Sequence, residues 1–290
     1  MVLDSRSVAL AKKIMRLAED VNSPPPAKAE LAYLNKFMCY ASLPHSDTGL
    51  SSYKRVVLFG DVSIKIYMHS EYGIPYGIWA RRLLAYVCQQ AILYKKKDIF
   101  LGKTQSDFLR NIRREEIMSS GGKRGYLTSI KEQAKRLFTS TLKIESNHSH
   151  QWSFNNSTFA EEGAFFENEN GSKNSGAWSG YITLSDSLFK DIINNSVPIE
   201  MCVVQQLQSS LTFDLYIWLR WKKFYTKKEI HISWDQLFVQ FGFGYQQNSL
   251  GKRDFKKKAK QSFAVLSACK SLLNFQIVYE TKKYLILRFY

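Results

Sequence analysis

The sequence predicts an α+β protein made of two tandem winged-helix domains that follow an N-terminal helical extension. Its 290 residues suffice for two domains of ordinary size. Apolar residues make up 45% of the chain and aromatic residues 14%, too many for a disordered chain, so most of the length should pack into cores. In each half of the chain, helical and strand patterns follow one another in the order helix, strand, helix, turn, helix and β-hairpin, which is the order of a winged helix.

We place the extension at residues 1–43, the first domain with a long polar wing and linker at 44–177, and the second domain at 178–290. The first twenty residues alternate charged and apolar side chains, which predicts an amphipathic helix and not a signal peptide. Prolines 24–26 cannot continue that helix.

In the first domain, β-branched and aromatic residues from Tyr53 to Met68 surround a Gly60-Asp61 turn signal and predict a hairpin. A core helix should begin near Pro75 and run through Tyr94. The elements expected next are a strand at 98–101, a helix at 106–112, a turn at Gly121-Gly122 and a long helix at 123–142. The Asn-rich and Ser-rich tract at 145–177, with a ragged hairpin near its phenylalanines, should form a wing and then a linker.

In the second domain, the spacing of apolar residues predicts helices at 186–193, 198–208 and 211–225, followed by a strand at 229–233. Ser233 and Gln236 have the spacing of a capping box, so the next helix should begin there. A glycine-rich turn, a basic helix at 252–268 and two terminal strands at 274–280 and 284–290 complete the expected order.

The charge balance points to a polyanionic partner. There are 41 Lys and Arg residues against 25 Asp and Glu residues, a net charge of +16. Nucleic acids and anionic membranes both match such an excess, but no stretch approaches the roughly 18 apolar residues that a spanning helix needs. We therefore expect a cytoplasmic protein that binds nucleic acid, has no membrane partner and needs no cofactor.

The basic helix near the C-terminus has two distinct faces on a helical wheel. Phe255, Ala259, Leu266 and Cys269 fall on one side, and Arg253, Lys256, Lys257 and Lys260 fall together on the opposite side. The predicted DNA-binding residues are Lys252, Arg253, Lys256, Lys257 and Lys260. The alternative is a solvated lysine face, the usual fate of a charge run, but the position just before a terminal hairpin favours DNA contact.

The helix at 123–142 has a similar pattern, with an apolar stripe formed by Leu127, Ile130, Ala134, Leu137, Phe138 and Thr141. The adjacent polar face predicts further DNA contacts at Lys123, Arg124, Thr128, Lys131 and Lys135. Early residues of a recognition helix usually reach base edges, so Arg124 and Thr128 are the candidates for base reading and the lysines for phosphate contact. Here too a solvated face is the alternative. Two such helices could enter successive major grooves about 34 Å apart on one face of a duplex.

Five ordered blocks resemble segments of plasmid-encoded RepA replication initiators, and together they span most of residues 41–260. The blocks are ASLPHSDTG (41–49), YGIPYGIWARRLLAYVCQQAI (72–92), SGGKRGYLTSIKEQAKRLF (120–138), SLTFDLYIWLRW (210–221) and ISWDQLFVQFG (232–242). The resemblance implies an initiator that binds repeated sites, or iterons, in double-stranded plasmid origin DNA. It also implies recruitment of the host initiator and replicative helicase, homodimers, and repression of the protein's own promoter.

Enzymatic alternatives find less support in the sequence, and we predict no catalytic residue. Gly102-Lys103-Thr104 is reminiscent of a phosphate loop, but Lys97 stands where that motif needs glycine. A rolling-circle nicking initiator would need histidine metal ligands and a tyrosine nucleophile. The one close histidine pair, His148 and His150, lies in the polar tract, so we predict no metal site.

Two further observations concern the cysteines and a second class of DNA-binding protein. The cysteines at 39, 88, 202 and 269 form no CxxC pair and predict buried thiols in a reducing compartment.

A winged-helix transcriptional repressor or a partition protein would use the same DNA-binding face, and only the family blocks favour initiation over these alternatives.

Overall fold

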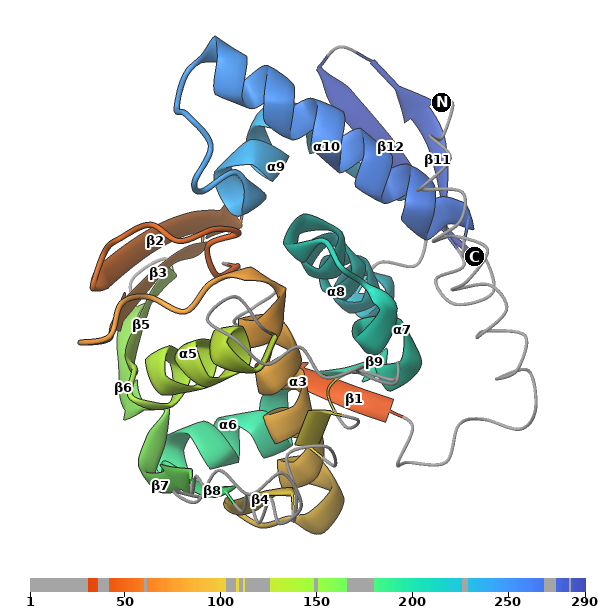
Figure 1. Ribbon diagram of the computed structural model, residues 1–290. Coiled ribbons are helices and arrows are strands. Elements are labelled where there is room, and N and C mark those ends of the chain that lie inside the picture. The colour runs from red at the N-terminus through yellow and green to blue at the C-terminus, as the bar shows by residue number, and fades with distance from the viewer. Residues whose placement is uncertain are drawn as a thin grey trace.

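The computed structural model describes residues 31–35, 42–59, 62–102, 108–109, 112, 126–148, 151–165, 180–225, 229–268, 275–281 and 283–290. They form a mixed α/β protein in which every paired strand is antiparallel (Figure 1). The elements are β1 (Leu31–Asn35), β2 (Ser52–Phe59), β3 (Val62–His69), α3 (Gly77–Tyr94), β4 (Asp98–Gly102), α5 (Tyr126–Phe138), β5 (Thr141–His148), β6 (Gln151–Thr158), β7 (Ala160–Phe165), β8 (Gly180–Leu184), α6 (Asp186–Asn195), β9 (Ser196–Glu200), α7 (Met201–Gln206), α8 (Ser210–Tyr225), β10 (Glu229–Ser233), α9 (Trp234–Phe241), α10 (Ser249–Ala268), β11 (Phe275–Glu280) and β12 (Tyr284–Phe289).

Helix α3 forms the centre of the molecule, and the expectation of a core helix there is confirmed. It packs against β1, α5, α6 and α8. Every residue from Ala80 to Gln89 is buried, because apolar side chains occur all around this helix and each face needs a cover. The helix ends at Lys95, which adopts a left-handed conformation.

Strands β2, β3, β5 and β6 form a four-stranded sheet in that order, with the predicted hairpin as β2 and β3. The turn at residues 60–61 lies outside the described residues. Alternate side chains such as Tyr53, Ile66, Met68 and Leu142 enter the core, as the two-residue period of a strand requires. The side chains that alternate with these, such as Lys54, Tyr67 and Lys143, lie on the opposite face of the sheet.

The two smaller sheets join segments that are far apart in the sequence. Strand β8 pairs with both β4 and β7, and β1 pairs with β9. The sheet β4-β8-β7 therefore contains residues from both sides of the predicted boundary at 177/178, and that boundary stays a prediction. Strand β1 belongs to the predicted N-terminal extension, whose first thirty residues lie outside the described part of the chain.

The C-terminal part runs α8, β10, α9, α10, β11 and β12, the order expected from the sequence. Its three strands form a sheet in the order β10-β12-β11. The capping box at the start of α9 is confirmed: the Ser233 hydroxyl accepts from the Gln236 backbone N–H at 3.1 Å, and the Gln236 side chain accepts from the Ser233 N–H at 2.9 Å. Figure 1 shows α10 lying along the outside of this part, over α8.

One predicted helix is shorter than expected. Helix α5 ends at Phe138, whereas the sequence predicted a helix up to Leu142. The Ser140 hydroxyl donates to the Leu137 carbonyl at 2.7 Å and so competes with the helical pattern. Thr141, assigned to the helix stripe, instead begins β5 opposite His69.

A second helix and the polar tract also differ from expectation. Residues 196–200 form β9 and only Met201–Gln206 is helical, because Val197 and Ile199 alternate inward and the backbone pairs with β1. The hairpin predicted near the phenylalanines is formed instead by β5 and β6. The spacing gave only a weak signal there, because the β6 side chains are almost all exposed and the apolar alternation is limited to Trp152 and Phe154.

A buried ion pair connects α3 to α8. Arg81 donates from Nε and Nη2 to the two carboxylate oxygens of Asp214, each at 2.7 Å, and both side chains are almost fully buried. The same carboxylate is 2.8 Å from His45 Nε2. Burial alone would raise the pKa of Asp214, but Arg81 and the hydrogen bond from His45 outweigh it and lower that pKa. Arg55 makes a second connection by donating to the Gln240 carbonyl at 2.6 Å.

No helix in the part of the chain that the structure describes is long and apolar enough to cross a membrane.

Candidate nucleic-acid interface

Helix α10 is held in place by aromatic side chains on its inner face. Phe255 is buried, with its ring edge-on to Phe238 of α9 at 5.4 Å and to Tyr245 of the preceding loop at 5.5 Å. Ala259 and Phe263 continue the buried stripe toward α8. The predicted apolar side of this helix is confirmed for Phe255, Ala259 and Leu266, while Cys269 lies outside the described residues.

The first turn of α10 packs tightly on the loop before it. Asn248 caps the helix by accepting from the Gly251 backbone N–H at 2.9 Å. A Cβ atom at Gly251 would lie 2.0 Å from the Gln246 carbonyl oxygen, so this position requires glycine. The loop and the cap together fix where the basic residues of α10 begin.

Two predicted residues of α10 face outward. Arg253 has 75% of its side chain exposed, and its nearest carboxylate is that of its neighbour Asp254, at 3.8 Å. Lys257, one turn further on, is exposed. Lys258, which sequence reasoning missed, is also exposed, with its ammonium group 5.4 Å from the centre of the Tyr245 ring. These three side chains form a positive surface on the outside of the helix.

The other predicted residues of α10 lie toward neighbouring elements. Lys256 lies 4.7 Å over the ring of Trp234 and donates to the Thr281 carbonyl at 3.4 Å, and desolvation lowers its pKa. Lys260 also lies over Trp234 and forms an ion pair with Glu280. The single positive face expected from the helical wheel is thus divided in two, because the wheel takes no account of the hairpin beside the helix.

Lys252 and the hairpin turn complete the positive surface of this region. Lys252 is paired with Asp235 of α9 at 2.6 Å, and both side chains are more than half exposed. Lys283 is exposed in the turn between β11 and β12, which the Thr281 hydroxyl stabilises by accepting from the Lys283 and Tyr284 N–H groups. The sequence could have identified Lys283, because it is a lysine in a predicted turn next to a predicted recognition helix.

Helix α5 carries the first predicted set of contacts. Its buried stripe is confirmed for Ile130, Ala134, Leu137 and Phe138, while the side chain of Leu127 lies outside the described residues. Thr128 and Lys135 are exposed, and Lys131 is half-buried. The ammonium group of Lys135 lies 3.8 Å from the centre of the Tyr72 ring.

Acidic residues also lie beside the basic residues of α5. Arg136 is 2.6 Å from Glu132 and 3.1 Å from Asp47. Lys131 and Lys135 line a cavity of about 550 Å³ whose other wall includes Glu161 and Glu162 of β7. A duplex approaching α5 would meet these carboxylates beside the lysines.

The predicted DNA-binding residues Lys123 and Arg124 lie outside the described part of the chain. So do Lys103 and Thr104 of the rejected phosphate loop, and, in the rejected metal site, His150 and the side chain of His148. Among the described residues, no group of three or more His, Cys, Asp and Glu side chains is placed to hold a metal ion. Cys88 is buried as predicted, whereas Cys202 is only partly buried.

Comparison with solved structures finds two RctB crystal structures of similar fold and a third structure with a lower score. Two crystal structures of domains 2 and 3 of RctB have TM-scores of 0.57 and 0.56, each at 14% identity. Each alignment covers 88% of this chain, with 95% and 96% of the RctB chains. The crystal structure of Pi initiator protein in complex with iteron DNA has a TM-score of 0.47 at 15% identity, covering 91% of this chain and 98% of that one.

No curated protein matches the sequence. The sequence does match the model of one protein family, described as plasmid encoded RepA protein, over residues 74–236. That region runs from the residue before Pro75 to the capping box of α9 and makes up more than half of the chain. The protein therefore belongs to the plasmid-encoded RepA family.

Proposed function

We propose that this protein initiates plasmid replication by binding repeated sites in double-stranded origin DNA. The observation that carries the proposal is the outward positive surface of α10, formed by Arg253, Lys257 and Lys258 beside a terminal hairpin. Membership of the RepA family supports initiation over a repressor or partition role, since the DNA-binding face alone would suit all three.

In this proposal the C-terminal part is a winged-helix module. Its element order supports the assignment of α10 to the recognition helix and of the β11–β12 hairpin to the wing. Arg253 and Lys257 would contact the duplex from the helix, and Lys283 would contact phosphates from the wing. Lys252, Lys256 and Lys260 would contribute mainly through the field around the helix, because each already contacts a neighbouring side chain or carbonyl group.

The N-terminal part would supply a second winged-helix module within 44–177. Helix α5 would present Thr128, Lys131 and Lys135 to the DNA, with Lys123 and Arg124 just before it. The order α3, β4, the helical residues 108–109 and 112, α5 and the β5–β6 hairpin supports this assignment. Two modules on one chain would let the protein read a site longer than one major groove.

The proposed partners beyond DNA are the host initiator, the replicative helicase and a second copy of this chain. We propose no cofactor and no catalytic step, so that origin opening would follow from binding. Repression of the protein's own promoter would use the same DNA-binding surface.

Footprinting on the DNA that flanks the gene tests the proposal. We expect protection of direct repeats, with affinity that falls by about 10³ to 10⁵ between 50 and 200 mM salt if 6 to 10 phosphates are contacted. A flat salt dependence would remove the electrostatic basis. Protection confined to a promoter, with no protected repeats, would favour a repressor.

A parallel incubation with supercoiled origin DNA and Mg²⁺ tests the absence of chemistry. We expect unchanged, unmodified DNA. A covalent adduct between protein and DNA would identify a nicking initiator and overturn the non-enzymatic assignment.

A further inference from the structure

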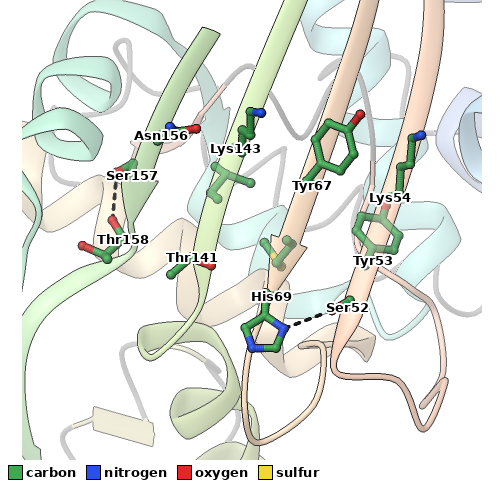
Figure 2. Close-up of a pocket in the computed structure, with 12 residues that line it drawn as sticks. Ser52, Tyr53, Lys54, Tyr67, His69, Thr141, Lys143, Asn156, Ser157 and Thr158 are labelled. Carbon is green, nitrogen blue, oxygen red and sulfur yellow. Dashed lines mark hydrogen bonds between the residues drawn. The ribbon is translucent and has the colours of Figure 1, made fainter.

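The outward face of the β2-β3-β5-β6 sheet has a composition unlike an ordinary solvated surface. In the strand register, Lys54, Tyr67, Lys143 and Asn156 form one row across the four strands. Figure 2 shows this row, with Tyr67 between the two lysines. The row borders an open groove of about 590 Å³.

Aromatic side chains continue this face toward the end of β6. Phe154 stands opposite Glu145, and Trp152 stands opposite Asn147, so both rings share the face of Tyr67 and Lys143. Trp152 is 58% exposed and Phe154 is 54% exposed, with ring centres 4.9 Å apart and planes tilted by 34°. Two large adjacent rings exposed to water are costly to a surface that has no partner.

The charge of this face is positive. Lys54, Lys65 and Lys143 point to this side, and Glu145 is the single carboxylate among the described residues of the face. Glu145 is paired with Lys143 at 2.6 Å, and this hydrogen bond lowers the pKa of Glu145. Lys54 and Lys65 therefore remain as excess positive charge beside the groove.

We propose that this sheet face, called here the platform and defined by Lys54, Lys65, Tyr67, Lys143, Trp152 and Phe154, binds single-stranded nucleic acid. Exposed rings on a flat sheet can stack on unpaired bases, and lysines beside them can follow the phosphates. The Asn156 side chain and the hydroxyl groups of the lower row in Figure 2 would add hydrogen bonds to sugar or base edges.

The geometry favours a single strand over a duplex. Bases within a duplex are already stacked and offer no free faces to Trp152 and Phe154. The rings stand on a sheet and not on a helix that could enter a major groove. The platform also differs from the α10 surface in its chemistry, since Arg253, Lys257 and Lys258 of α10 are basic, whereas the platform combines aromatic rings with basic residues. The two surfaces can therefore be tested separately.

The test uses the full chain and a fluorescent oligothymidine of about 15 nucleotides, with a duplex containing the direct repeats as the second probe. We expect the wild-type protein to bind both. Changing Trp152→Ala and Phe154→Ala together should weaken oligothymidine binding about tenfold or more and leave duplex affinity within about twofold. Both rings are more than half exposed, so the fold should survive the change.

Three matched variants sharpen the result. Tyr94→Ala removes an exposed ring at the far end of α3, 67% exposed, and should leave both affinities unchanged. The pair Trp152→Phe and Phe154→Tyr keeps the stacking surface and should restore oligothymidine binding. Lys257→Ala should weaken duplex binding and leave the oligothymidine unaffected.

Two outcomes would overturn the proposal. The first is equal oligothymidine affinity in the wild type and in the Trp152→Ala/Phe154→Ala variant. The second is loss of self-association in that variant, measured by sedimentation, with oligothymidine binding unchanged, which would make the platform a contact between two copies of the chain. If the wild-type protein binds oligothymidine but not the duplex with direct repeats, that result would count against the proposed function and would not contradict single-strand binding by the platform.

Discussion

The described elements of the N-terminal and C-terminal parts of this protein follow a similar order, but their strands pair differently. In the C-terminal half, the strand β10 that precedes the last two helices pairs with β12 of the terminal hairpin. In the N-terminal half, the equivalent strand β4 pairs with β8, and the β5–β6 hairpin pairs with β3 instead. The hairpin next to α10 is thus part of a small local sheet, whereas the hairpin after α5 belongs to a larger one.

The basic residues differ in the same way. On α10, Arg253 and Lys257 face outward and the residues on the hairpin side contact Trp234 or Glu280. On α5, Arg136 is held by two carboxylates and two lysines share a cavity with acidic residues. The presence of basic residues on a helix therefore does not by itself make them available to DNA, and we expect α10, whose Arg253, Lys257 and Lys258 face outward, to supply most of the electrostatic affinity.

The largest expected effect comes from removing the buried ion pair between Arg81 of α3 and Asp214 of α8. Asp214→Asn should lower the free energy of unfolding by about 3 to 5 kcal/mol, because it leaves the guanidinium of Arg81 buried without its counter-ion. Urea denaturation measures this change. Asp186→Asn, which breaks an exposed pair with Lys97, is the control and should leave the free energy of unfolding nearly unchanged, because solvent screens that pair. Similar losses of unfolding free energy in both variants would contradict a stabilising role for the buried Arg81–Asp214 pair.

The next effect tests the comparison directly. Arg253→Ala with Lys257→Ala should weaken duplex binding and reduce the slope of affinity against salt by about 2, one for each lost phosphate contact. Lys131→Ala with Lys135→Ala should reduce that slope by less than about 1, because Glu161 and Glu162 lie beside these lysines. Salt titrations of both variants decide the matter. Equal slopes would mean that the halves contribute equally.

A smaller effect separates the two sides of α10. Lys256→Ala should lower the free energy of unfolding by about 0.5 to 1 kcal/mol, since the ammonium group lies over Trp234 and bonds to the Thr281 carbonyl. Lys257→Ala should change stability by less than about 0.5 kcal/mol. Thermal or urea unfolding measures both. A larger stability loss for Lys257→Ala would show that the outward residue is structural.

The smallest effect is the pH dependence of stability that comes from His45 beside the buried Arg81–Asp214 pair. Burial lowers the pKa of His45 below 6.5 despite the opposing effect of Asp214, so the folded protein keeps a neutral ring. Below about pH 6.5 the unfolded chain takes up a proton that the folded chain does not, so stability is lost as pH falls toward the folded-state pKa. Unfolding at about pH 7.5 and pH 5.5 should show a smaller loss in His45→Gln than in the wild type. An equal loss in both proteins would assign the effect to other groups.

Local patterns in the sequence predicted most of the elements but not how the strands pair. Ser233 and Gln236 gave the start of α9, and the spacing of Phe255, Ala259 and Leu266 gave the inner face of α10. These signals lie within a few residues of one another. The pairings of β1 with β9 and of β4 with β8 depend on segments far apart in the chain, and no local period records them.

The candidate site was predicted only in part, because contacts between different elements also decide which side chains are exposed. A helical wheel shows which residues share a side of α10 but not what lies next to that side. Trp234 and Glu280 come from other elements, and they decide that Lys256 and Lys260 turn toward the hairpin. Lys258 was missed because its position beside Tyr245 depends on the packing of the loop before α10.

The pairing of β1 with β9 affects how the chain can fold as it is made. Leu31 meets Glu200, so β1 waits for a partner about 165 residues further along. At synthesis rates of about 5 to 20 residues per second, that wait lasts roughly 10 to 30 s. During this time the edge of β1 is open to wrong partners, and a nascent chain stalled before residue 196 should be a good substrate for chaperones and proteases.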